Sequence, residues 1–246
     1  MIWFIIATLV AFFIKGLCGF ANTLIFNGIL SYTANNINIS PLEVVLGYPS
    51  NIILVWKERK SLNWKIWLPL TALVVAGSIP GIFLLKHTDA GLLKVIFGIV
   101  VIVIGVEMLF REMKSNRESS NRKPGGSKLV LILIGIISGL LCGLYGVGAL
   151  LAAYVSRVAE NSHEFKANIC VVFVVENTIR IILYAATGIL TLAVLKQVVI
   201  LIPFMLAAVF LGMKSSSVLN EKIIKKIVIV LLILSGIVLI INNIPR

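Results

Sequence analysis

Long apolar runs are the feature that most limits what this chain can fold into, because eight of them fill most of its 246 residues. They span residues 1–31, 42–56, 66–85, 91–110, 129–155, 165–186, 190–213 and 223–243. A helix needs about 20 apolar residues to cross a hydrocarbon layer roughly 30 Å thick. No run alternates as a barrel strand does, and lipid offers no partner to free backbone groups, so helices remain. The sequence therefore predicts an all-α, polytopic membrane protein with short loops.

Charged residues are scarce and unevenly placed. They make up 13% of the chain, about half of what soluble domains carry, and the formal net charge is +12. The basic residues lie in short loops between apolar segments, which is typical of the positive-inside bias rather than of a nucleic-acid surface. The three cysteines lack metal-ligand spacing. We therefore expect a lipid bilayer as surroundings and no nucleic acid, metal or cofactor.

A polar linker divides the chain nearly in half. Residues 111–128 carry six basic and two acidic side chains, and the apolar segments on its two sides look like copies of each other. Gly81, Lys94 and Gly105 recur at an offset of 131 as Gly212, Lys225 and Gly236, and Gly16 and Gly19 recur at an offset of 127 as Gly143 and Gly146. We predict a first repeat over 1–110, a cytoplasmic linker over 111–128 and a second repeat over 129–246. The alternative is chance matching among small residues.

Segments 1 and 5 favour a particular topology. If each enters and leaves the membrane by the same face, sixteen basic residues fall on one side and four on the other. Eight simple crossings give a weaker division of twelve against eight. Both segments are long and have a glycine-rich interruption that allows the backbone to reverse. We therefore predict two pseudo-symmetric repeats of four segments, with segments 1 and 5 broken or re-entrant. Eight tilted transmembrane helices remain the alternative.

The broken segments would create an anion site. Their second legs would begin at Asn22 and near Ala149, so two helix N-termini would face the middle of the membrane. Glycines let a ligand approach the free backbone N–H groups and the positive end of each helix dipole. The candidate binding residues are Gly16, Gly19 and Asn22 in the first copy and Gly143, Gly146 and Gly148 in the second. The alternative is that these glycines only allow close helix packing.

Segment 6 contains charges in the middle of an apolar run. Glu176, Asn177 and Arg180 lie between Val175 and Ile181, at a depth where charges are costly unless they face a cavity or a partner. Arg180 could bind an oxyanion with its planar fork, together with Asn177. Glu176 is placed to pair with Arg180 on one helix face, or to carry a coupling proton. The alternative is a purely structural ion pair.

Further polar residues lie in apolar segments. Lys15, near the turn of segment 1, could add a positive charge to the pocket or complement the C-terminal dipole of the first leg. Four others could line the same path or could form interhelical hydrogen bonds. These are Asn27, Tyr48, Ser50 and Asn51.

These motifs resemble those of the TauE/SafE sulfite-exporter-like family, also called the toluene sulfonate uptake permease group. The second copy of its glycine-rich motif is similar to Gly139, Gly143, Gly146, Gly148 and Ala149, and a degenerate first copy to Gly16, Gly19, Phe20, Ala21 and Asn22. Ala21, Asn22 and Ala149 stand where the family has glycine, and the proline that follows the motif is absent from both copies.

The resemblance implies a multi-pass permease of the plasma (inner) membrane. It would move a small anion such as sulfite, a sulfonate or a related organic acid by alternating access at a midplane site, with protons as a possible coupling ion. A transporter rather than an enzyme is expected; an intramembrane enzyme and a membrane scaffold are the alternatives. The transported anion, the direction of transport, the coupling ion and the oligomeric state stay open.

Overall fold

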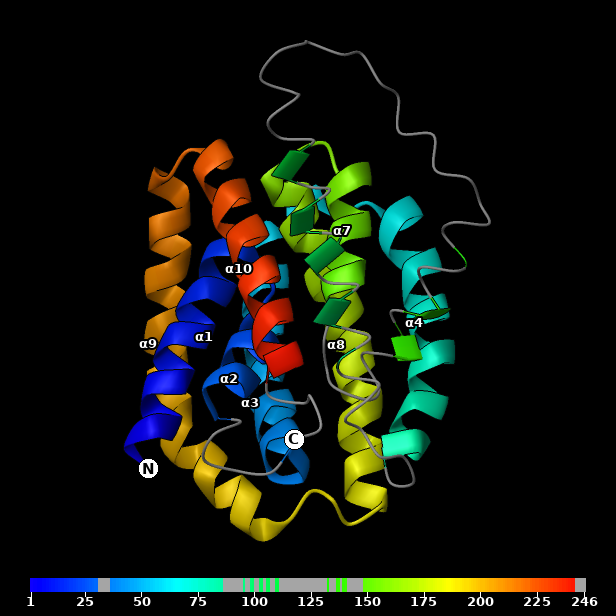
Figure 1. Ribbon diagram of the computed structural model, residues 1–246, viewed down its shortest axis with the longest axis vertical. Helices are drawn as coiled ribbons and strands as arrows, with labels where there is room; N and C mark the ends of the chain where they lie inside the picture. Colours follow the sequence, from blue (N-terminus) through cyan, green and yellow to red (C-terminus); the bar gives the residue numbers. More distant parts are fainter. Residues whose placement is uncertain are drawn as a thin grey trace.

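A computed structural model describes residues 1–30, 36–85 and 148–241, together with short helical pieces between residues 95 and 140. The elements are α1 (Ile2–Cys18), α2 (Asn22–Leu30), α3 (Asn36–Glu58), the 3₁₀ turn η1 (Arg59–Ser61), α4 (Trp64–Leu85), α7 (Ala149–Val158), α8 (Ser162–Ala186), α9 (Leu192–Val218) and α10 (Glu221–Ile241). Figure 1 shows these helices running side by side as a bundle. The all-helical prediction is confirmed for the described residues.

Several helices are suited to a membrane. Three are long and apolar enough to cross it by length and composition: residues 39–61, 162–186 and 192–218. Two shorter apolar helices, Ile2–Cys18 and Trp64–Pro80, accompany them. The linker 111–128 lies outside the described residues, as do most of segment 4 and most of the first leg of segment 5. The number of crossings and the division into two repeats therefore stay predictions.

Segment 1 is a helical hairpin. Helix α1 ends at Cys18, Gly19 adopts a left-handed conformation with φ 85°, and α2 begins at Asn22. The rings of Phe12 and Phe26 lie 6.4 Å apart between centroids, whereas fourteen residues of one straight helix would separate them by about 21 Å. Segment 1 is therefore two helices packed against each other, and not one long kinked helix.

Helix α3 begins earlier than the hydropathy pattern indicates. The apolar run was expected to start at residue 42, but the helix starts at Asn36 and continues through Pro41 and Pro49. A proline inside a helix removes one backbone hydrogen bond, so the polar, proline-containing stretch before Leu42 has the composition of a loop. The added turns place Glu43 within the helix instead of at its edge.

Close backbone contact joins α1 to α9, which lie next to each other in Figure 1. A Cβ on Gly16 would lie 2.4 Å from the carbonyl oxygen of Val209, and one on Gly212 would lie 2.1 Å from that of Phe13. Only glycine allows two helix backbones to approach this closely. The packing alternative that the sequence left open for Gly16 therefore describes its surroundings.

A second glycine contact has the same form. A Cβ on Gly77 in α4 would lie 2.3 Å from the carbonyl oxygen of Ile136, and one on Gly139 would lie 2.2 Å from that of Val74. In the first contact, segment 1 (residues 1–31) packs on segment 7 (190–213). In the second contact, segment 5 (129–155) packs on segment 3 (66–85). Segments at equivalent places in the two predicted repeats are thus paired crosswise.

Replacing Gly212 by Ala should destabilise the protein. The added methyl group would overlap backbone atoms of α1, which cannot yield as a side chain end does, and such overpacking costs about 1 to 3 kcal/mol. The measurement is the apparent melting temperature in detergent. Gly28→Ala is the matched control, because a Cβ there would lie 3.6 Å from Val238, an ordinary contact. Equal melting temperatures for the two variants would contradict the close α1–α9 contact.

Candidate functional site

The turn between α1 and α2 is fixed against α8. A Cβ on Gly19 would lie 3.0 Å from Cγ of Lys166, and the Cys170 thiol donates a hydrogen bond of 3.3 Å to the Gly19 carbonyl oxygen. Ala21 follows with φ 72°, a conformation that costs a residue with a Cβ roughly 1 to 2 kcal/mol. The turn is thus placed by tertiary contacts strong enough to hold a strained residue, and glycine is needed at its tip.

A small pocket lies beside this turn. Its walls are formed by Lys15, Phe20, Ala21, Asn22, Thr23, Leu24, Glu43, Asn51, Gly148, Phe173 and Asn177. The cavity volume is about 20 Å³, which suffices for roughly one water molecule. Residues at the start of α2 and the residue preceding α7 therefore share one cavity.

The predicted glycines divide between packing and the pocket. Gly16 and Gly19 contact α9 and α8 respectively, while Gly148, the N-cap residue of α7, is part of the pocket wall. A Cβ on Gly148 would lie 2.3 Å from Cζ of Phe173. Gly143 and Gly146 lie outside the described residues.

Lys15 is the cation in the pocket wall. Its side chain is 1% exposed, and Nζ donates a hydrogen bond of 3.0 Å to Oδ1 of Asn22. The ammonium also lies 5.8 Å from the ring centroid of Phe173, within cation–π range. Its side chain therefore reaches the start of α2 and the pocket wall, while its role in binding an anion stays a prediction.

Glu43 is a site residue that sequence reasoning missed. One of its carboxylate oxygens accepts hydrogen bonds from Nδ2 of Asn22 and, at 2.8 Å, from Oγ1 of Thr23. A Cβ on Gly47, one turn along α3, would lie 3.3 Å from that oxygen and 3.5 Å from Nδ2 of Asn177. The missing side chain of Gly47 thus leaves room where three polar groups converge.

The omission of Glu43 has a physical cause. In the sequence, a charge one residue inside the apolar run 42–56 indicates the polar end of a membrane segment. The helical start at Asn36 moves Glu43 two turns into α3, and it is 2% exposed. A usable signal was present: Glu43 is the sole charge between Lys15 and Lys57 in the sequence.

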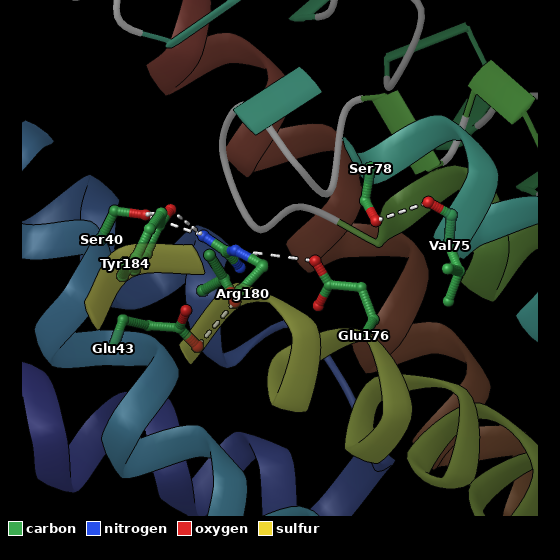
Figure 2. Close-up of polar contacts among 8 residues, drawn as sticks. Ser40, Glu43, Val75, Ser78, Glu176, Arg180 and Tyr184 are labelled. Atoms are coloured by element: carbon green, nitrogen blue, oxygen red, sulfur yellow. Dashed lines mark hydrogen bonds and ion pairs between the residues drawn. The ribbon is translucent and has the colours of Figure 1, made fainter. Parts of the chain in front are cut away.

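Arg180 and Glu176 form the predicted ion pair. Nε of Arg180 lies 3.6 Å from Oε1 of Glu176, and both side chains are buried. Nη2 of Arg180 donates hydrogen bonds of 2.8 Å to Ser40 and 2.9 Å to the Tyr184 hydroxyl. Figure 2 shows the guanidinium between Glu176 on one side and Ser40 with Tyr184 on the other. Arg180 is not one of the residues that form the pocket wall, and its guanidinium already has partners.

The remaining polar candidates fall into two groups: residues that line the pocket and residues that form hydrogen bonds elsewhere in the helix bundle. Asn177 and Asn51 line the pocket, whereas Ser50 donates to the Gly47 carbonyl oxygen and Tyr48 accepts from Thr178. Asn51 is fully buried, and neither its Oδ1 nor its Nδ2 has a hydrogen-bond partner among the residues that the structure describes. A buried amide without partners is costly, and Asn51 presents such an amide in the pocket wall.

Within the described residues, no group of three His, Cys, Asp or Glu side chains is arranged to hold a metal ion.

The family model described as "Sulfite exporter TauE/SafE" matches residues 4–239, nearly the whole chain. No curated protein matches the chain, and no solved structure does.

Proposed function

The chain belongs to the sulfite exporter TauE/SafE family, and we propose that it carries sulfite or a short sulfonate across the plasma membrane. It is an integral membrane transporter for small sulfur anions, as the family and its apolar helices indicate. What the proposal adds is a particular substrate, a particular site and a mechanism.

The observation that carries the proposal is the composition of one pocket. A buried ammonium, the N-terminus of a helix and an unpartnered amide meet there, contributed by Lys15, α2 and Asn51. The first backbone bond of α2 runs from the Ile25 N–H to the Ala21 carbonyl oxygen, 3.2 Å. The amide groups of residues 22–24 therefore precede the helical ladder. An oxyanion is the kind of ligand that all three features would stabilise.

The residues have distinct proposed roles. Lys15 supplies charge, the amides of Asn51 and Asn177 donate hydrogen bonds, and Gly148 lets the start of α7 approach the anion. Arg180 acts from outside the pocket wall, since its charge attracts the carboxylates of Glu43 and Glu176. It thereby keeps the site from being dominated by negative charge.

Alternating access is the proposed mechanism. The pocket has room for about one water molecule, so a sulfur oxyanion would require it to widen. The crosswise glycine contacts of Gly16 with Gly212 and of Gly77 with Gly139 support two inverted repeats that move against each other. Rearrangement at these contacts would open the pocket first to one side and then to the other.

A ligand screen followed by flux measurement tests the function. We expect sulfite or methanesulfonate, but not potassium ions at equal ionic strength, to raise the melting temperature of the detergent-purified protein, because ligands that bind the folded state stabilise it. Proteoliposomes should then accumulate the stabilising anion in an unaltered chemical form. A chemically altered product would support an intramembrane enzyme. Absence of both stabilisation and flux would refute the proposal.

A further inference from the structure

We propose that Glu43 is the proton carrier of this transporter, so that each monoanion crosses together with one proton. The inference rests on the proposed anion transport and deepens it by assigning the coupling ion and its binding residue. It depends on three features: the position of Glu43, the charges around it and the way it differs from Glu176.

Glu43 occupies the place that an anion would take. Its carboxylate accepts hydrogen bonds from the side chains of Asn22 and Thr23, the first two residues of α2, and it forms part of the pocket wall next to Lys15. A carboxylate at the start of a helix is stabilised by the same dipole and donors as a bound oxyanion. In the empty site, Glu43 is thus an internal substitute for the substrate.

The surrounding charges balance without a substrate. The ionisable groups that interact with Glu43 come from two helices: Lys15 on α1 and Arg180 on α8 as cations, with Glu176 on α8 as the second acid. Two cations and two carboxylates sum to zero formal charge. A monoanion that entered this apolar interior would leave one uncompensated negative charge, which is strongly unfavourable there. Uptake of one proton restores the balance.

The geometry selects Glu43 over Glu176 for that proton. Glu176 forms an ion pair with Arg180 and is not part of the pocket wall. Glu43 lines the pocket and shares its donors with the site where the anion would bind. When an anion takes over Lys15 and the α2 donors, Glu43 loses their stabilisation of its charged form, whereas Glu176 keeps its arginine.

The coupled step is a simple proton transfer. The Glu43 carboxylate takes one proton from water on the side to which the pocket is open, an O–H bond forms on the carboxyl group, and the anion enters. On the opposite side the anion leaves, Lys15 and the donors of Asn22 and Thr23 return to Glu43, and the proton is released. No net charge moves for a monoanion, so a pH gradient drives accumulation and a membrane voltage does not.

Methanesulfonate is the probe for the test, because it is a strong acid whose charge stays constant over the pH range used. Proteoliposomes with the voltage clamped to zero receive labelled methanesulfonate at an external pH one unit below the internal pH. Wild-type protein should accumulate it up to about tenfold, the ratio that one coupled proton allows per pH unit. Glu43→Gln should lose this accumulation, measured relative to its own exchange of labelled for unlabelled anion. Glu160→Gln, on an exposed residue, should behave as wild type.

The outcomes separate the two hypotheses. If wild-type protein exchanges no anion, the proposed function fails and this inference fails with it. If exchange occurs but Glu43→Gln still accumulates methanesulfonate in response to the pH gradient, or if only Glu176→Gln loses the accumulation, Glu43 is not the carrier. Calorimetric titration of wild-type protein in two buffers of different protonation enthalpy gives an independent result that needs no variant. We expect uptake of about one proton per bound anion, and uptake of none would overturn the inference.

Discussion

Lys15→Met is expected to weaken anion binding and transport strongly while leaving the protein folded. The substitution keeps an apolar stem of similar length but removes the ammonium from the pocket wall, where Nζ donates to Asn22. Hydrogen bonds to charged groups contribute about 1.5 to 3 kcal/mol, so methanesulfonate should bind roughly ten- to a hundredfold more weakly. The loss should be larger still because Glu43 is then less compensated. The measurement is the ligand-induced rise in melting temperature, together with exchange flux in proteoliposomes.

Lys196→Met is the control for this prediction. Lys196 lies exposed on α9, so the variant loses the same charge without changing the pocket, and its flux should equal that of wild type. If Lys15→Met bound and exchanged methanesulfonate as wild type does, the pocket described here would not be the anion site. A Lys15→Met protein that elutes as a single species but no longer responds to the anion is the expected result.

Arg180→Met is expected to cause the largest loss of stability. Removing the guanidinium leaves Glu176 as a buried carboxylate without its cation and takes the donor from Ser40 and Tyr184. Breaking a buried ion pair by removing one partner costs about 3 to 5 kcal/mol. The apparent melting temperature in detergent should therefore fall markedly, and any protein that still inserts into liposomes should show reduced flux.

A double variant separates charge compensation from packing. When Glu176→Met accompanies Arg180→Met, no uncompensated carboxylate remains at this pair, and replacing both partners by apolar side chains is often neutral. The double variant should therefore be more stable than Arg180→Met alone. If the single variant kept wild-type stability and full flux, the guanidinium would have neither the structural nor the functional role assigned to it.

Much of the fold followed from local sequence patterns. The apolar segments and their helical nature were predictable because lipid leaves few alternatives for the backbone. The start of α2 at Asn22 and of α7 near Ala149 could be placed from the glycine-rich interruptions of segments 1 and 5, because the conformational preference of glycine is local. The pairing of Glu176 with Arg180 followed from helical spacing alone.

The site itself was only partly predictable. The hydrogen bonds of Arg180 to Ser40 and Tyr184 come from tertiary packing, and its predicted contact with the anion stays a prediction. Glu43 was missed because a helix through Pro41 is locally unfavourable, and only packing against α8 and the neighbouring helices stabilises it there. The sequence likewise did not decide whether Lys15 adds a charge to the pocket or complements the C-terminal end of α1.

The sequence by itself determined that this chain is a helical membrane protein, where its first segment breaks, and which residue types a small anion would need. Only the tertiary structure decided which of those residues share a cavity and that a second acid, Glu43, is among them. The reason is that the hydropathy pattern and the backbone preferences of glycine decide the structure of only a few neighbouring residues. The meeting of Lys15, Glu43, Asn51 and Gly148 depends instead on how three separate helices, α1, α3 and α7, pack, which no local pattern specifies.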